Sequence, residues 1–226
     1  IDLTLPKIDA HCHVLDPKRF PYHEQVAYRP SGQEIGTADY FQQVMSCYGV
    51  RHALLVGPNS GYATDNRCLL DAIARAPQTF KGIAVVANDT PLETLQVLRS
   101  KGVIGVAFNP SLMGFDHYAH IEPLLQRLQN LDMWAQFQVE HDQLLDFVPF
   151  FKRIGVKVMI DHCGRPDHRA GLSQAGFQQL LALGREGRCV VKLSGFAKFS
   201  ATGFPFSDAR PYIEALAHDF GLAHCV

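Results

Sequence analysis

The sequence predicts an α/β fold, a (β/α)8 barrel of the TIM-like class. Short runs of β-branched and apolar residues alternate with segments of helical periodicity, which is typical of βαβ units that build a parallel sheet. Most of the predicted strands are nearly continuous apolar runs, as expected for strands covered on both faces. Seven such units in 226 residues favour a barrel over a doubly wound sheet, because a (β/α)8 barrel typically takes about 250 residues.

The seven predicted units follow one another without a linker or a low-complexity tract. Strands are expected over residues 7–14, 52–57, 81–87, 103–109, 133–140, 156–162 and 189–194. Helices are expected over residues 38–48, 65–76, 91–101, 121–130, 141–154, 173–186 and 208–220. Gly49, Gly102, Gly155 and Gly221 stand where four of these helices must stop in a left-handed turn. The segment 16–37, rich in Pro, Tyr and Gly, is predicted to be a long loop over the mouth of the fold.

The series is one strand short of a closed barrel. Residues 223–226 have the pattern of an eighth strand that stops almost as soon as it starts. An open seven-stranded barrel would leave two unpaired sheet edges, so we favour a chain that is a truncated piece of a longer one. We therefore expect residues 1–226 to form a single barrel domain from which most of the eighth strand is missing.

The composition argues against several classes of protein. The chain carries 21 Lys and Arg against 22 Asp and Glu, without basic clusters, so it lacks the electrostatic footprint of a nucleic-acid binder. No apolar run approaches the roughly 18 residues of a membrane span. The motifs GxGxxG, GxxxxGK[ST] and GxSxG are absent, which disfavours a nucleotide cofactor and a serine nucleophile elbow. The leading class is a soluble enzyme that acts on a small molecule.

The cysteines indicate a compartment. All 6 are scattered along the chain and form no CxxC pair. Free thiols in a reducing cytoplasm fit this pattern best. A disulfide framework in a periplasmic protein is the less favoured alternative, because a domain of this size rarely depends on disulfide bonds for its stability. We expect a cytoplasmic protein.

The most informative motif is the HxH of His11 and His13 at the carboxyl end of the first predicted strand. Side chains at i and i+2 lie on one face of a strand, so both imidazoles would project toward the barrel mouth, where such enzymes place their sites. Two adjacent imidazoles make half of a metal site or a polar catalytic wall. A purely structural or surface role is the alternative for an isolated HxH.

His162 closes the sixth predicted strand and is the second candidate. Because it also falls at a carboxyl end, it could converge with His11 and His13 into one catalytic and metal-binding cluster. Zinc in hydrolytic sites usually has three protein ligands and a water, often with a carboxylate nearby. The alternative is that His162 is hydrogen-bonded in a turn.

Two further residues are candidates for substrate binding. Arg165 follows in the same loop as His162 and could hold a substrate carboxylate through a bidentate contact, or it could be a solvated surface residue near Asp167. Asn109 ends the fourth predicted strand and could donate its amide to a carbonyl oxygen, or it could cap a turn.

The fifth and seventh predicted strands carry polar residues with period two. Gln136, Gln138 and Glu140 form a polar row in a segment that should be buried, so they need partners. Gln138 is the best placed of the three to bind a ligand, and internal hydrogen bonding is its alternative role. Lys192 and Ser194 share a face and could line the mouth, although Lys192 could instead pair with an internal carboxylate.

The chain resembles the amidohydrolase superfamily, specifically the branch of metal-dependent hydrolases that contains lactonases. The resemblance is carried by IDAHCHV, TDN at residues 64–66, GVIGVAFN, MIDHCGRPD and VVKLSG, in this order over essentially the whole chain. It implies a distorted (β/α)8 barrel that hydrolyses a lactone with His11, His13, His162 and an eighth-strand aspartate. The family motif that holds the aspartate would begin where this sequence stops, at Val226.

The resemblance also bears on the substrate. Tyr28 matches a tyrosine of the family's substrate-access loop, Arg165 matches an arginine that binds substrate, and Lys198 lies near a second arginine position. Ala107 and Met113 stand where members acting on a dicarboxylate have further arginines. Because bidentate partners are lost, we expect a lactone with fewer anionic groups.

The resemblance implies one divalent metal ion, with zinc the first choice, although some members of the branch work without metal. The expected reaction is attack of an activated water on the lactone carbonyl, with the oxyanion stabilised by the histidines or by a metal held there. A metal-dependent decarboxylase of the same superfamily and a non-catalytic ligand-binding barrel are the alternatives. The expected partner is a small lactone, not a nucleic acid or a membrane, and homo-oligomerisation stays open.

Overall fold

The computed structural model describes residues 5–26 and 28–226. The chain forms two compact units, Ile1–Ala107 and Phe108–Val226. Each unit is built from parallel strands and helices that alternate along the chain.

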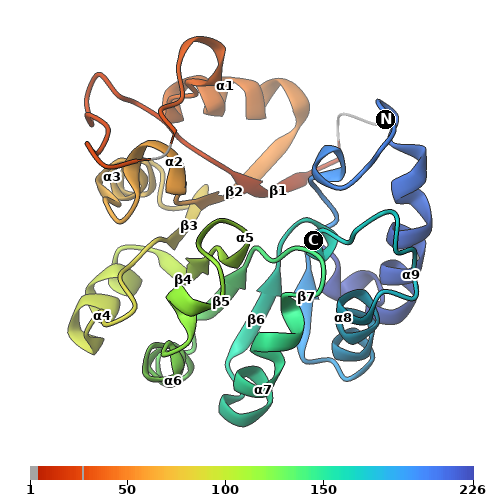
Figure 1. The fold of residues 1–226 in the computed structure, drawn as a ribbon. Helices are drawn as coiled ribbons and strands as arrows, with labels where there is room; N and C mark the ends of the chain where they lie inside the picture. The colour runs from red at the N-terminus through yellow and green to blue at the C-terminus, as the bar shows by residue number, and fades with distance from the viewer. Residues whose placement is uncertain (1–4, 27) are drawn as a thin grey trace. The chain divides into compact units, whose positions relative to one another are not determined.

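The first unit contains the strands β1 (Lys7–Cys12), β2 (Val50–Val56), β3 (Phe80–Ala84) and β4 (Val103–Phe108), whose last residue begins the second unit. They pair in parallel in the order β1, β2, β3, β4 (Figure 1). Helices and turns connect them: η1 (Gly32–Glu34), α1 (Ala38–Tyr48), α2 (Asn59–Tyr62), α3 (Arg67–Arg75) and α4 (Leu92–Ser100).

Local sequence signals set the bounds of α1. Its first backbone groups are satisfied by Thr37, whose hydroxyl accepts a hydrogen bond from the Tyr40 N–H at 3.2 Å. The helix ends at Gly49, which takes a left-handed conformation with φ 70°. The core of this unit includes Leu55, Phe80, Ile83 and Leu95, all fully buried, which indicates strands covered by helices.

The second unit contains the parallel strands β5 (Trp134–Phe137), β6 (Lys157–Ile160) and β7 (Cys189–Val191), in this order. Its long helices are α6 (Glu122–Asn130), α7 (Leu144–Ile154), α8 (Ala175–Arg185) and α9 (Arg210–Phe220). Short helical turns complete it: α5 (Pro110–Met113), η2 (Asp116–Tyr118), η3 (His162–Gly164), η4 (Phe196–Lys198), η5 (Ser207–Ala209) and η6 (Leu222–His224).

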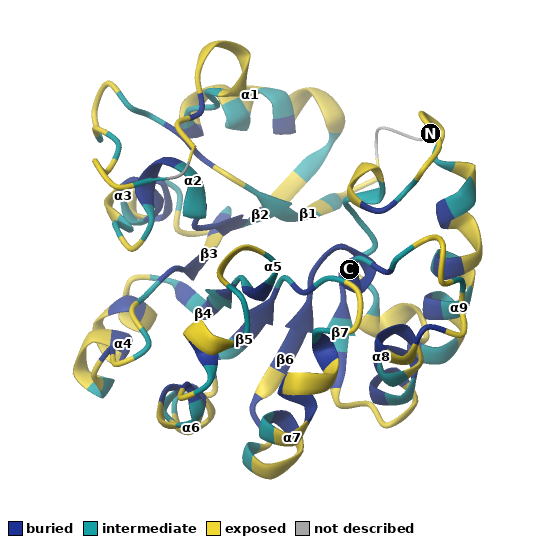
Figure 2. Cartoon of the chain, in the orientation of Figure 1, coloured by how far each residue is buried: buried dark blue, intermediate teal, exposed yellow. Residues whose placement is uncertain are grey.

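Aromatic rings pack the interface between the strands and α7 in the second unit. Phe137 on β5 stacks on Phe108 with ring centroids 4.7 Å apart, and it meets Phe147 and Phe151 of α7 at 5.2 and 4.9 Å. Figure 2 shows β5 and β6 almost wholly buried, while α7 exposes its outer face. This apolar layer fixes the strand ends that carry the polar residues described below.

The predicted strands and long helices all occur in the predicted order, but each strand ends one to three residues earlier than predicted. The fifth, sixth and seventh strands end at Phe137, Ile160 and Val191, whereas the apolar pattern extended them to residues 140, 162 and 194. The residues beyond each end leave the ladder and turn. The short helices α2 and α5 were not predicted, because four residues give no helical period.

The last residues of the chain pair with β7. Cys225 forms a parallel bridge with Val191, and the Leu193 N–H donates to the Val226 carbonyl at 2.7 Å. Residues 225 and 226 therefore lie alongside β7, where the sequence predicted the start of a further strand. Within the described residues, no helix is both long enough and apolar enough to cross a membrane.

Candidate active site

In the first unit, the two histidines of the HxH motif lie together. His11 is on β1, and His13 follows the end of the strand by one residue. Their ring centroids are 5.1 Å apart and the ring planes are nearly perpendicular, at 89°. The period of two along the strand thus places both imidazoles on one side, as predicted.

A carbonyl oxygen of the neighbouring strand fixes the orientation of His13. Its Nδ1 lies 2.8 Å from the backbone oxygen of Val56, the last residue of β2. Because a carbonyl oxygen only accepts, Nδ1 carries the proton and donates it. Any metal or substrate contact of this ring would therefore be made through Nε2.

Tyr28, predicted to bind substrate, is engaged within its own loop. Its hydroxyl donates to the carboxylate of Glu34, which also accepts from the Ser31 N–H at 3.1 Å. This hydrogen bond raises the pKa of the Tyr28 phenol and lowers the pKa of the Glu34 carboxyl. Tyr28 is about half exposed, at 52%. A substrate that uses this hydroxyl must share it with Glu34.

In the second unit, His162 opens a turn directly after β6 in which four consecutive residues are left-handed. The φ angles of residues 162–165 are 53°, 58°, 72° and 44°, and only the third residue, Gly164, is a glycine. Such angles cost a non-glycine residue about 1–3 kcal/mol each and persist only where the surroundings hold them. His162 is 7% exposed within this turn.

The turn is held from β7 and the residues after it. Nδ1 of His162 lies 3.0 Å from the hydroxyl of Ser194, and the Cys163 N–H donates to the Lys192 carbonyl at 2.9 Å. Gly195 packs flat against the imidazole, because a Cβ atom there would lie 2.6 Å from the ring. As for His13, an oxygen at Nδ1 makes Nε2 the nitrogen through which the ring would act.

A buried ion pair lies next to His162 in the sequence. The Lys192 ammonium is 3.3 Å from Asp161 Oδ1 and donates to Gln136 Oε1 at 2.8 Å. The Gln136 amide closes the triangle by donating to Asp161 Oδ2 at 2.9 Å. The Lys192 and Asp161 side chains are 1% and 4% exposed. Lys192 therefore pairs with an internal carboxylate, which is one of the two roles that the sequence left open.

Asp161 is a residue whose role the sequence analysis missed. Its carboxylate and the His162 ring offer ligand atoms within 4.8 Å of each other. The only signal in the sequence was its place beside the candidate histidine, where it read as the end of an apolar strand. A carboxylate at this distance is a suitable neighbour for a metal-binding imidazole.

Three of the predicted substrate-binding residues share one partner, the hydroxyl of Ser111. This hydroxyl accepts from Arg165 Nη1 at 2.9 Å and from Gln138 Nε2 at 3.1 Å, and it donates to Asn109 Oδ1 at 2.8 Å. One donor and two acceptors exhaust what a hydroxyl can offer. Ser111 was missed, because a serine in a four-residue helix gives no pattern.

Asn109 combines both roles that were considered for it. Its side-chain oxygen caps α5 by accepting from the Leu112 N–H at 3.2 Å. Its amide nitrogen has no hydrogen-bond partner in the described part of the chain. The amide group is therefore the part of Asn109 that can meet a substrate oxygen.

Arg165 lines a pocket of about 240 Å³ that lies wholly within the second unit, here named the Arg165 pocket. Its charged lining comprises Glu140, Arg165, Asp167, Arg169 and Lys198. Arg165 Nη2 is 2.9 Å from Glu140 Oε2, and Arg169 Nε is 3.1 Å from Asp167 Oδ1. The guanidinium and N–H of Arg169 lower the pKa of Asp167 to about 2, so its carboxylate is ionised near neutrality.

The structure thus gathers Asn109, Gln138 and Arg165 around Ser111 and places Lys198 in the pocket that Arg165 lines. It gathers His11 and His13 in the other unit. That these two histidines meet His162 stays a prediction. His11 and His13 lie at the end of the first strand and His162 follows the sixth, and the carboxyl ends of strands are where β/α barrel enzymes place their active sites.

Comparison with known families gives the class. The amidohydrolase family model matches residues 8–226, and the chain belongs to this family. Among characterised relatives, a 4-sulfomuconolactone hydrolase from Rhizobium radiobacter is 29% identical over 226 residues, which covers 96% of this chain and 73% of that protein.

Solved structures agree with the fold. A protein from Pseudomonas putida, provisionally designated a 2-pyrone-4,6-dicarboxylic acid hydrolase, matches with a TM-score of 0.82 and 30% identity over 100% of this chain and 82% of that one. An amidohydrolase from Burkholderia multivorans with bound zinc matches with a TM-score of 0.71 and 20% identity, covering 98% and 82% of the two chains.

These comparisons confirm three predictions made from the sequence. The family is the amidohydrolase family, the fold class is that of its TIM-like β/α barrels, and the class of enzyme is a hydrolase. The relatives also agree with the expected reaction, because their names refer to the hydrolysis of lactones and pyrones.

Proposed function

We propose that this protein hydrolyses a lactone, with His11, His13 and His162 as catalytic residues that hold one divalent metal ion, zinc first. Three of its relatives are named for the hydrolysis of 4-sulfomuconolactone or of a pyrone dicarboxylate. We further propose a single catalytic domain in the cytoplasm, in keeping with the six free cysteines.

The donor set fits a divalent ion. Imidazole nitrogens and a carboxylate such as Asp161 are ligands that zinc prefers. His13 and His162 each have an oxygen at Nδ1, the carbonyl of Val56 and the hydroxyl of Ser194, which is the usual arrangement behind a metal-binding imidazole. A bound ion would polarise the carbonyl and lower the pKa of a water molecule.

The residues of this chain would then orient the substrate and stabilise charge. Ring opening joins a water oxygen to the carbonyl carbon, breaks the bond from that carbon to the ring oxygen, and gives the ring oxygen a proton. The imidazoles would stabilise the negative charge that develops on the carbonyl oxygen. Five side chains would position the remaining polar groups of the lactone: Tyr28, Asn109, Gln138, Arg165 and Lys198.

The observation that carries the proposal is the turn at residues 162–165. Three non-glycine residues hold left-handed angles there, and the turn is tied by Ser194, Lys192 and Gly195. Strain of this kind is retained where the position of a side chain is used. In a member of the amidohydrolase family, a buried histidine fixed in this way is best explained as a catalytic group.

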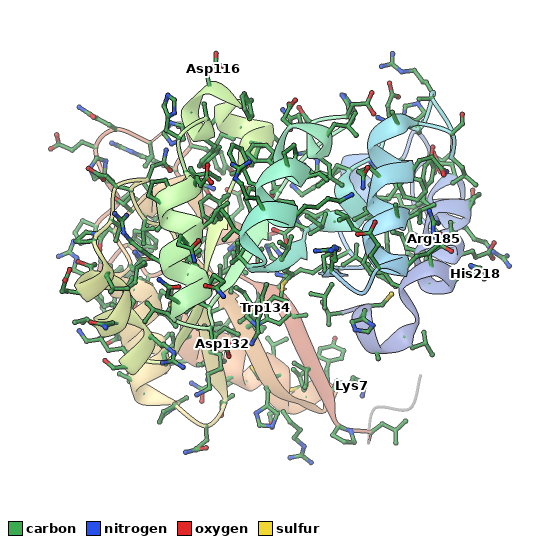
Figure 3. The ribbon with its side chains drawn as sticks, turned by 90° about the horizontal axis from the view of Figure 1, so that it is seen from below. Lys7, Asp116, Asp132, Trp134, Arg185 and His218 are labelled. Carbon is green, nitrogen blue, oxygen red and sulfur yellow. The ribbon has the colours of Figure 1, made fainter. Side chains whose placement is uncertain are left out.

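A panel of sugar and muconate-type lactones tests the proposal, with turnover followed in a pH-stat because each opened ring releases an acid. Wild type should open at least one lactone and lose activity in a chelator. His162→Ala should lower kcat by roughly 100-fold or more. His218→Ala is the matched control, because His218 is 86% exposed beside Asp219 and lies with Arg185 at the outer surface (Figure 3). Release of CO2 without ring opening would instead identify a decarboxylase.

A further inference from the structure

The charges of the Arg165 pocket nearly cancel. Three cationic side chains, Arg165, Arg169 and Lys198, face two carboxylates, Glu140 and Asp167, which leaves one positive charge in excess when the histidines are neutral. We propose that Glu140 is a specificity-determining residue that neutralises Arg165 and limits the substrate to a lactone with one negatively charged group. This inference rests on the proposed function and names the substrate class of that site.

The contacts of Arg165 carry the argument. Arg165 Nη2 lies 2.9 Å from Glu140 Oε2, and Nη1 donates to the Ser111 hydroxyl at 2.9 Å. Both terminal nitrogens of the guanidinium therefore already have partners from the chain. A bidentate clamp on a substrate carboxylate needs two such N–H groups side by side. An incoming carboxylate would therefore compete with Glu140 and meet its negative charge at close range.

Lys198 carries the positive charge that the two carboxylates of the pocket leave unbalanced. Arg165 and Arg169 are paired with Glu140 and Asp167, whereas Lys198 has no ion pair with any residue of 5–26 or 28–226. It is exposed at the end of η4 and lines the same pocket. One carboxylate or sulfonate of the substrate would balance it.

Glu140 is placed to act on the substrate and not only on the fold. Its side chain is 30% exposed and Arg165 is 20% exposed, so the ion pair borders the pocket. Gln138 and Asn109, which share the Ser111 hydroxyl with Arg165, are neutral and suit hydroxyl and carbonyl oxygens. A second carboxylate on the ring would meet these groups and Glu140 instead of an unpaired cation.

The test compares two lactones with the same ring, one carrying one carboxylate and the other two, in wild type and Glu140→Gln. Glutamine keeps the shape and a hydrogen-bond acceptor but removes the charge. Wild type should favour the monoanion by at least tenfold in kcat/KM. Glu140→Gln should raise kcat/KM for the dianion at least tenfold through KM, and change the monoanion less than threefold.

Two further variants distinguish an effect of charge from a general loss of folded protein. Glu140→Asp retains the charge and should retain the preference for the monoanion. Lys198→Met should raise KM for the monoanion at least tenfold, and by a larger factor than for an uncharged lactone of the same ring. An equal loss for both lactones in Glu140→Gln, with unchanged KM values, would show that Glu140 only anchors the turn and would overturn the inference.

Calorimetric binding of the chemically ring-opened products of the two lactones separates this inference from the proposed function. These products carry two and three carboxylates, because ring opening adds one. Wild type should bind the product of the one-carboxylate lactone at least tenfold more tightly than the product of the two-carboxylate lactone, and Glu140→Gln should reverse or abolish that ratio. If no lactone of any charge is opened, the proposed function fails. The ratio of the two binding affinities would still test whether the Arg165 pocket selects by charge. Equal affinities in wild type would reject the charge selectivity itself.

Discussion

The hydroxyl oxygen of Ser194 lies 3.0 Å from Nδ1 of His162. Ser194 follows β7 and His162 follows β6, so the contact joins the ends of two adjacent parallel strands. The neighbouring Gly195 leaves room for the imidazole, because a Cβ atom there would overlap the ring. The geometry of His162 is therefore set by the seventh strand as much as by its own turn.

Removing the hydroxyl should loosen His162 without unfolding the protein. We expect Ser194→Ala to weaken zinc binding about 10- to 100-fold, because the oxygen at Nδ1 orients the ring. Competition with a zinc-binding dye measures this affinity. Ser173→Ala is the control, since its hydroxyl donates to the Ala170 carbonyl at the surface. Equal zinc affinities for the two variants would contradict the positioning role.

A methyl group at residue 195 should displace the imidazole. Gly195 and Gly187 have nearly equal φ angles of 67° and 64°, but only the Cβ at 195 would meet His162, at 2.6 Å. Both alanine variants should lose about 1 kcal/mol of unfolding free energy through backbone strain. Gly195→Ala should lose a further 1–3 kcal/mol or so from overpacking, together with activity. Urea denaturation of the two alanine variants measures this difference in stability. Indistinguishable curves would argue against close packing of residue 195 on His162.

The buried ion pair should be costly to break. Lys192→Met leaves the Asp161 carboxylate without its buried cation, and we expect the free energy of unfolding to fall by about 3–5 kcal/mol. Asp161→Asn in the same chain should restore part of this loss. Thermal and urea unfolding measure both effects.

The control is a surface pair of the same type. Lys157 pairs with Asp132 at 2.6 Å and lies over the Trp134 ring, and Figure 3 shows Asp132 beside Trp134. Because this pair is exposed, Lys157→Met should change stability by only about 0–1 kcal/mol. A loss as large as that of Lys192→Met would indicate that burial is not what makes the internal pair important.

Asp167 should titrate unusually low. Its hydrogen bonds to Arg169 lower the pKa to about 2 from the ordinary 3.8. A lowered pKa in the folded state gives stability that is present above pH 3.8 and is lost as the pH falls toward 2. Carboxyl NMR should find this midpoint in wild type and a higher midpoint in Arg169→Met, still below 3.8 because the backbone N–H of residue 169 continues to donate to Asp167. Identical midpoints in the two proteins would remove Asp167 from the fixed charges of the pocket.

Periodicity was sufficient to predict the order of the strands and long helices, and it placed His11 and His13 on one side. It could not predict the turn at His162, because residues 162, 163 and 165 take left-handed angles without being glycine. Those angles are imposed by contacts with residues 192–195, about thirty positions away, and such contacts leave no local pattern.

The candidate substrate-binding side chains are likewise only partly predictable from the sequence. The period of two over Gln136, Gln138 and Glu140 correctly predicted polar residues that need partners. Their partners Lys192, Ser111 and Arg165 come from other segments, so only the folded chain reveals them. Ser111 was missed for this reason, and so was the neutralisation of Arg165 by Glu140.

The most direct test of the central claim is ring opening of a monoanionic lactone in 18O-labelled water, followed by mass spectrometry of the product. Attack of water on the carbonyl carbon puts one labelled oxygen into the new carboxylate of every product molecule formed by wild type, and His162→Ala should form almost none. Label in the product hydroxyl, or undiminished turnover by His162→Ala, would contradict hydrolysis at a site built on this histidine.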